Sequence, residues 1–329
     1  MASQLLGDLP ELRVVDASAC FVTGVDLYGP YQVRHHTRCK FTTTYYVALF
    51  IDFKSKAVHL EVVPDASTQA FINALARFIA DHGRVRHIFS DNATNFQGTA
   101  NLLRKVQHQL HKDNGKIAAA CQNHGVQWHF IPARSPNFDG LWERSIKIAK
   151  GLMKAVMMKS SYTHDEFHTL VRQVAAVINS RPITQQTSDP NDFEPLTPGH
   201  FVYGGSPSLL PLSMVPIESN PLKAYHSIQR RLQEYSKRFQ TEYLQELQRR
   251  AKWHLPSPNV TVGQMVLLKE PNAHSINWSL ARVIETYPDE HGHVRVVKVN
   301  TPKGERTRAI SNIAPLPVVS DEKDKVPPT

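Results

Sequence analysis

The sequence predicts an α/β fold, in which a mixed sheet flanked by helices is followed by a long helix and a small β-barrel. Three observations predict it. Strand-like runs fill residues 21–63, helical and strand-like patterns alternate from there to about residue 180, and four short strand-like runs lie beyond residue 258. A chain of 329 residues is long enough for one sizeable core and a second, smaller one.

The first part of the chain has the pattern of three antiparallel strands followed by helices and strands in alternation. The runs TTYYVALFIDF and AVHLEVV are rich in β-branched and aromatic residues and are separated by KSK. STQAFINALARFIADHG begins with a Ser/Thr cap and reaches a terminating Gly83. VRHIFS predicts a strand that leads to Asp91, and VQWHFI predicts another. Helices are predicted from 140 to about 158 and from 164 to about 180.

The second part begins with a segment, 189–221, whose many prolines and glycines predict an extended connector without regular helix. Apolar residues then recur every three or four positions, which predicts one amphipathic helix from 225 to about 253. Four strand-like runs joined by turn signals predict the barrel. The predicted divisions are an N-terminal linker (1–16), a core (17–205), a Pro-rich linker (206–224), the helix (225–255), the barrel (256–318) and a disordered tail (319–329).

The charge of the chain favours a polyanionic partner. Its formal net charge is +9, and Lys and Arg outnumber Asp and Glu by 15 to 8 between residues 223 and 317. A basic excess of this kind is typical of nucleic-acid binding. No run approaches the roughly 18 apolar residues that a membrane span needs, and no signal peptide is evident. Three cysteines without a CxxC pair fit an intracellular location.

Three acidic residues are candidate metal ligands. Asp26 lies in the predicted first strand and Asp91 ends a later strand, so the two can sit side by side at the rim of the sheet, where carboxylates need a cation between them. Glu143 lies near the start of a predicted helix. The same helix face carries cations at i+4, i+7 and i+11, namely Lys147, Lys150 and Lys154.

This arrangement suits phosphoryl transfer, in which two divalent ions clamp the attacking and leaving oxygens. Hard oxygen ligands favour Mg²⁺, with Mn²⁺ as the other choice. Each signal alone has a plainer interpretation, because an Asp at a strand end is often a turn residue and a lysine stripe is often a solvated helix face.

Several strings, in order, resemble the integrase of LTR retrotransposons, most closely of the Pao/BEL group: TGVDLYGP, KAVHLEVV, FSDNATNF, PARSPNFDGLWER, INSRPIT and DPNDFEPLTPGHF. The resemblance extends from about Gln4 to Pro317. It implies an RNase H-like core and an SH3-like DNA-binding barrel, with Asp26, Asp91 and Glu143 as the catalytic carboxylates. It also implies that Lys147 and Lys150 touch the terminal DNA of the element. A loop that holds Asn92 and Asn95 would approach target DNA.

The sequence departs from this family at several points. Ala93 stands where the family has Gly, and Asp139 replaces a small residue close to Glu143. The interval from Asp91 to Glu143 exceeds that of retroviral integrases, which implies an insertion at 105–122. The His/Cys zinc module that precedes the core in complete integrases is not found, so zinc is not expected. The spacing of His108, His111, Cys121 and His124 permits a zinc site, although polar helical surface is the simpler account.

The leading expectation is a DNA-integrating enzyme that trims the 3′ ends of element DNA and joins them to target DNA in one active site. Its partners would be both DNAs and further copies of itself, and it would act in the nucleus. A domesticated or truncated DNA-binding protein without catalysis is the alternative. A third is an RNase H-like nuclease acting on hybrids. Trp278 and Tyr287 can either stack on bases or pack in the barrel core.

Overall fold

The structure, a computed structural model, describes residues 18–35, 41–83, 85–91, 127–131, 151–154, 157, 162–187, 189, 192–209, 223–248, 259–269 and 278–317. None of the helices in these ranges is both long and apolar enough to cross a membrane.

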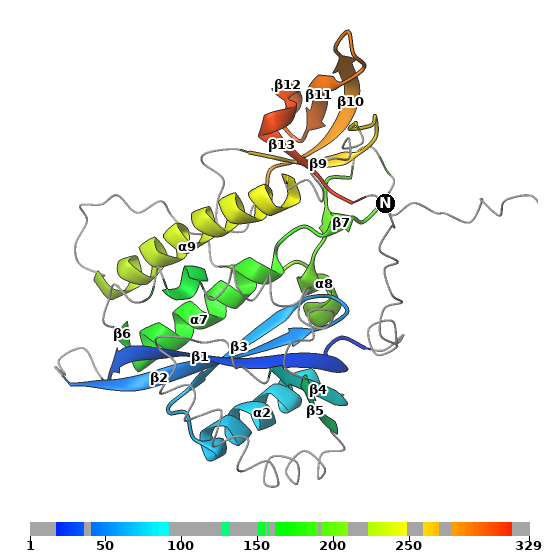
Figure 1. The fold of residues 1–329 in the computed structure, drawn as a ribbon. Coiled ribbons are helices and arrows are strands. Elements are labelled where there is room, and N and C mark those ends of the chain that lie inside the picture. Colours follow the sequence, from blue (N-terminus) through cyan, green and yellow to red (C-terminus); the bar gives the residue numbers. More distant parts are fainter. Residues whose placement is uncertain are drawn as a thin grey trace, which may run out of the picture.

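A mixed sheet forms the centre of the first part of the chain. Its strands are β1 (Val22–Arg34), β2 (Thr42–Asp52), β3 (Val58–Val63), β4 (His87–Asp91) and β5 (Gln127–Ile131), in the order β3-β2-β1-β4-β5 (Figure 1). The first three are antiparallel, while β4 runs parallel to β1 and β5 parallel to β4. The short β6 (Tyr162–Thr163) adds to β1. This sheet confirms the predicted RNase H-like class.

Helices cover both faces of the sheet, with α2 (Thr68–His82) on one side and α7 (His164–Asn179) and α9 (Lys223–Gln248) on the other (Figure 1). The predicted cap of α2 is present, because the Ser67 side chain accepts a hydrogen bond from the Ala70 backbone and the helix ends at Gly83 with φ 73°. The α2 side has its own core, in which Phe50 stacks on Phe78 with ring centroids 4.1 Å apart.

The prediction that residues 189–221 contain no regular helix was wrong. Helix α8 (Pro198–Tyr203) lies within this segment, and the short strands β7 (Thr184–Gln185) and β8 (Pro195–Leu196) pair before it. Proline suits the first position of a helix, where its missing N–H has no intrahelical acceptor to lose. The helix ends at Gly204, whose φ of 74° is left-handed. Here proline and glycine mark the two ends of a short helix.

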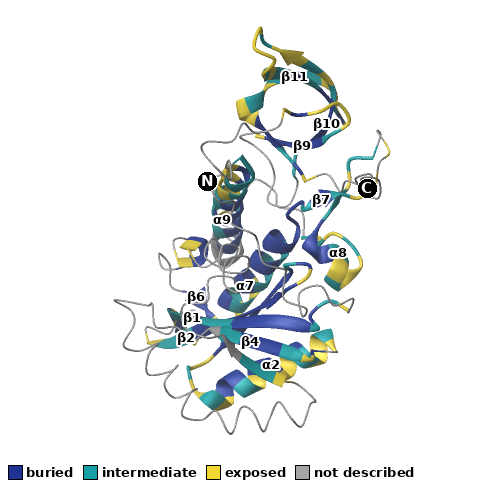
Figure 2. Ribbon diagram, turned by 45° about the vertical axis from the view of Figure 1, so that its right-hand side comes forward, coloured by how far each residue is buried: buried dark blue, intermediate teal, exposed yellow. Residues whose placement is uncertain are grey.

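A separate antiparallel sheet forms the C-terminal part. The four predicted runs are β9 (Met265–Leu268), β10 (Leu280–Pro288), β11 (Val294–Thr301) and β12 (Gly304–Ala309), and after a 3₁₀ turn (Ile310–Asn312) the unpredicted β13 (Ile313–Pro315) pairs with β9. The order is β12-β11-β10-β9-β13. The sheet curls around buried residues (Figure 2), as an SH3-like barrel does. The domain divisions themselves stay a prediction.

Trp278 and Arg282 hold the barrel against the rest of the chain. The Trp278 ring meets the Tyr243 ring of α9 edge-on at 5.4 Å, and its Nε1 donates to Ser180 Oγ at 3.4 Å. The buried Arg282 donates to the backbone oxygens of Asp189 at 2.8 Å and of Gly263 at 3.0 Å. Of the two interpretations of Trp278, packing is therefore the one that the structure supports.

Replacing Trp278 with alanine should lower the free energy of unfolding by about 2 kcal/mol, because the aromatic contacts to α9 are lost and a cavity is left at the junction. Urea denaturation would measure the loss. Tyr287→Ala is the matched control: this barrel aromatic is 41% exposed, so we expect its loss to cost less than about 0.5 kcal/mol. Equal losses for the two variants would contradict the docking role of Trp278.

Candidate functional site

The backbone places the first two candidate ligands on neighbouring strands. Asp26 lies in the central strand β1, and the parallel pairing of β1 with β4 aligns Gly24 with Phe89 and Val25 with Ser90. One step further along, β1 reaches Asp26 and β4 reaches its last residue, Asp91. Adjacent strands are about 4.8 Å apart. The two acidic residues therefore stand at the same level on adjacent strands, with Asp91 at the end of β4 and Asp26 within β1.

Asp26 is half-buried on the sheet face that α7 and α9 cover. Alternation along β1 puts Val25 in the core under α2 and Tyr28, two residues beyond Asp26, in the opposite core. The Tyr28 hydroxyl donates to Met153 Sδ at 2.7 Å. Burial, reinforced by Tyr31, Tyr235 and the Asp26 carboxylate, raises the pKa of Tyr28 well above its usual value. Tyr28 is thus a neutral phenol beside Asp26.

Met153 also ties the helical segment 151–154 to this face of the sheet. Its side chain is fully buried and follows Glu143 by ten positions in the sequence. The next residue, Lys154, is exposed. The third predicted ligand, Glu143, and the predicted DNA contacts Lys147, Lys150, Asn92 and Asn95 lie outside the described residues, as do the four residues of the alternative zinc spacing.

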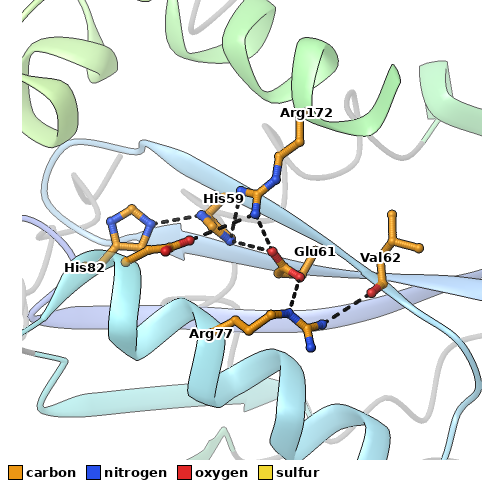
Figure 3. Close-up of polar contacts among 7 residues, drawn as sticks. His59, Glu61, Val62, Arg77, His82 and Arg172 are labelled. Atoms are coloured by element: carbon orange, nitrogen blue, oxygen red, sulfur yellow. Dashed lines mark hydrogen bonds and ion pairs between the residues drawn. The ribbon is translucent and has the colours of Figure 1, made fainter. Parts of the chain in front are cut away.

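A charged cluster that the sequence did not predict lies on the edge strand β3, which β2 separates from β1 (Figure 3). Glu61 is only 2% exposed and accepts from Arg77 Nε of α2 at 2.8 Å and from Arg172 Nη2 of α7 at 2.5 Å. Because β3 is an edge strand, arginines from the helices on both faces reach the same carboxylate. His59 Nε2 lies 3.5 Å from Glu61, and His59 Nδ1 lies 2.9 Å from His82 Nε2.

These contacts fix the protonation of the cluster. Burial acts to raise the pKa of Glu61, but hydrogen bonds from His59 and Arg77, with the charges of Arg172 and Arg77, outweigh it and lower the pKa to about 2. Burial, with the neighbouring His59, lowers the pKa of His82 to about 4. At neutral pH Glu61 is therefore charged and His82 is neutral.

The cluster has the residue types of a metal site, since ligand atoms of His59, Glu61 and Asp81 lie within 4.8 Å of one another. However, the Arg172 guanidinium already contacts all three, at 3.4 Å from His59, 2.5 Å from Glu61 and 3.9 Å from Asp81. Two acids and two arginines balance in charge. The guanidinium thus occupies the position that a metal cation would take, so the cluster is an ion-pair network and not a metal site.

Comparisons with known proteins bear on both parts of the chain. Residues 223–316, which contain α9 and nearly all of the barrel, match a family described as "Family of unknown function (DUF5641)". A search of curated proteins finds no match. A chain of the simian T-cell lymphotropic virus intasome, solved in complex with PP2A regulatory subunit B56 gamma, is 15% identical, with 92% of this chain and 80% of that chain covered and a TM-score of 0.36. The catalytic core domain of BIV integrase is 14% identical, with 56% and 95% covered and a TM-score of 0.34.

Proposed function

We propose that this chain is a polynucleotidyl transferase of the Pao/BEL integrase kind, which processes the 3′ ends of element DNA and joins them to target DNA. The observation that carries the proposal is the parallel pairing of β1 with β4, which brings Asp26 and Asp91 to the same level on adjacent strands. Glu143, the third carboxylate, comes from the sequence pattern. Integrase activity also implies homo-oligomers that assemble on DNA and a nuclear site of action.

The proposed ligands suit Mg²⁺ or Mn²⁺, since carboxylate oxygens are hard donors. Two such ions would supply Lewis-acid stabilisation of the attacking and leaving oxygens. The neutral Tyr28 packs Met153 against β1 and so supports the helix that follows Glu143. Lys147, Lys150 and Lys154 would bind phosphates of the element end, and Asn92 and Asn95 would contact target DNA.

The barrel would supply binding that does not depend on sequence. Arg306 and Arg308 occupy alternate positions of the edge strand β12, so they lie on the same side of that strand. Arginines at a sheet edge can meet successive phosphates, and such contacts give salt-dependent affinity with little preference for bases. This property suits insertion at many target sites.

The test is joining of a short duplex with the element's end to target DNA by the purified chain, with Mg²⁺ and then with EDTA. We expect joining only with the metal, and none above background from Glu143→Gln. Equal joining by the parent and Glu143→Gln would refute the assigned chemistry. Salt-sensitive DNA binding without joining under any divalent ion would instead favour the DNA-binding protein without catalysis. Degradation of RNA in hybrids, again without joining, would favour the nuclease.

A further inference from the structure

A cavity of about 350 Å³ adjoins the charged cluster, between α7, β3 and the segment that follows α8. Its apolar wall consists of Ala175, Ala176 and Pro207. Its polar lining consists of His59, Arg172, Tyr203, Ser206 and Ser208. Arg172, Tyr203, Ser206 and Ser208 can each donate a hydrogen bond, and among the described residues that line the cavity there is no aspartate or glutamate. The volume falls in the range of small-molecule sites.

Arg172 is held in place at this cavity. Its guanidinium forms an ion pair with the buried Glu61 and lies 3.9 Å from Asp81. The Arg172 side chain nevertheless remains 40% exposed. A guanidinium has five N–H donors, and the contacts to Glu61 and His59 use only some of them. A fixed, partly exposed guanidinium is a good partner for phosphate oxygens.

The lining segment that carries Ser206 and Ser208 packs closely against α8. Gly199 of α8 lies against Pro207 so closely that a Cβ at position 199 would stand 2.3 Å from Pro207 Cδ. This contact anchors the segment that carries Ser206 and Ser208. Tyr203 is 56% exposed and also lines the cavity, so it supplies an aromatic side chain of the kind on which bases stack.

We propose that this cavity is a binding site for a nucleoside phosphate, with the phosphate on Arg172 and the serine hydroxyls and the base against Tyr203. The chemistry is the same for a free mononucleotide and for the phosphorylated end of a nucleic-acid strand. The site adjoins β3, whereas Asp91 ends β4 on the other side of the sheet's central strand. It therefore does not require the proposed joining activity.

Calorimetric titration of the full chain with deoxyadenosine monophosphate tests the site. Deoxyadenosine, which lacks the phosphate, and inorganic phosphate, which lacks the nucleoside, are titrated separately. Removing the phosphate should weaken binding at least about 10-fold, because a charge-assisted contact is lost. Ala176→Leu adds three carbons to the apolar wall of the cavity and removes no member of the ion-pair network, so it should weaken binding at least about 10-fold while the melting temperature stays near that of the parent.

Arg172→Gln and Arg77→Gln form a matched pair. Both arginines bind Glu61, but only Arg172 lines the cavity. Both variants should lose stability, whereas only Arg172→Gln should lose nucleotide binding, by at least about 10-fold. No binding by the folded parent, or binding by Ala176→Leu as tight as that of the parent, would overturn the proposal.

A 5′-phosphorylated trinucleotide shows whether the site binds a strand end or a free nucleotide. Its binding signal with Ala176→Leu is subtracted from that with the parent, which removes binding elsewhere on the chain. Tighter cavity-dependent binding of the trinucleotide than of the mononucleotide assigns the site to a strand end. The reverse order assigns it to the free nucleotide. These measurements need no divalent metal. Nucleotide binding at the cavity can therefore be absent while DNA joining is present, and it can be present while joining is absent.

Discussion

Replacing Asp26 with asparagine should reduce DNA joining at least about 100-fold while the fold is kept. The substitution removes the negative charge that a divalent ion would need. Even the loss of a residue that only hydrogen-bonds to a metal ligand lowers metal affinity or activity about 10- to 100-fold. Asparagine has nearly the same shape, and position 26 is half-buried in the strand β1. We therefore expect a melting temperature within a few degrees of the parent's.

Asp65→Asn is the matched control for this experiment. Asp65 is an exposed aspartate just after β3, and its carboxylate accepts a hydrogen bond from the Ser67 backbone that an asparagine oxygen can also accept. Joining by this variant should equal that of the parent. A joining rate for Asp26→Asn within a few-fold of the control would remove Asp26 from the proposed metal site.

Sequence periodicity predicted much of the core because local signals and burial agree there. The β-branched run AVHLEVV and the Ser67 and Gly83 caps correspond to β3 and α2 as observed. Composition misled at α8, since Pro198 and Gly204 mark the ends of a helix as well as turns. The strand β13 has three residues, too few to show a period.

The Glu61 network shows why part of a site escapes sequence reasoning. His59 and Glu61 interrupt an apolar strand at alternate positions, which signals two polar side chains on one face. Nothing local, however, says that Arg77 and Arg172, which lie 16 and 111 positions from Glu61, meet there. That meeting depends on β3 being an edge strand between two helices, a property of the sheet order alone. For Asp26 and Asp91, by contrast, the prediction that they lie side by side needed only the two strands that carry them, and the pairing of β1 with β4 sets them at the same level.

Glu61→Gln should cost about 3 kcal/mol of unfolding free energy at pH 7, because two arginines lose the charge of a nearly fully buried partner. Glu234→Gln on α9 is the matched control. Glu234 also binds two arginines, Arg231 at 3.3 Å and Arg238 at 2.8 Å, but its side chain is 30% exposed, so its loss should cost less than about 1 kcal/mol. Urea denaturation of both variants measures the difference, and equal losses would show that burial of Glu61 adds nothing.

The pH dependence of that loss identifies its cause. The pKa of Glu61 is about 2 in the folded chain, below its ordinary value of 4.5, so the unfolded chain binds the proton first as the pH falls. The contribution of Glu61 is therefore complete above about pH 5 and disappears toward pH 2, where the parent and Glu61→Gln should become equally stable. Folding lowers the pKa of His82 from 6.5 to about 4, so the unfolded chain binds this proton first as well. The parent and Glu61→Gln should therefore both lose stability as the pH falls from 6.5 to about 4, starting before the Glu61 effect begins to disappear. If the difference in unfolding free energy between the parent and Glu61→Gln stays constant down to pH 2, the substitution acts through packing and not through the ion pairs.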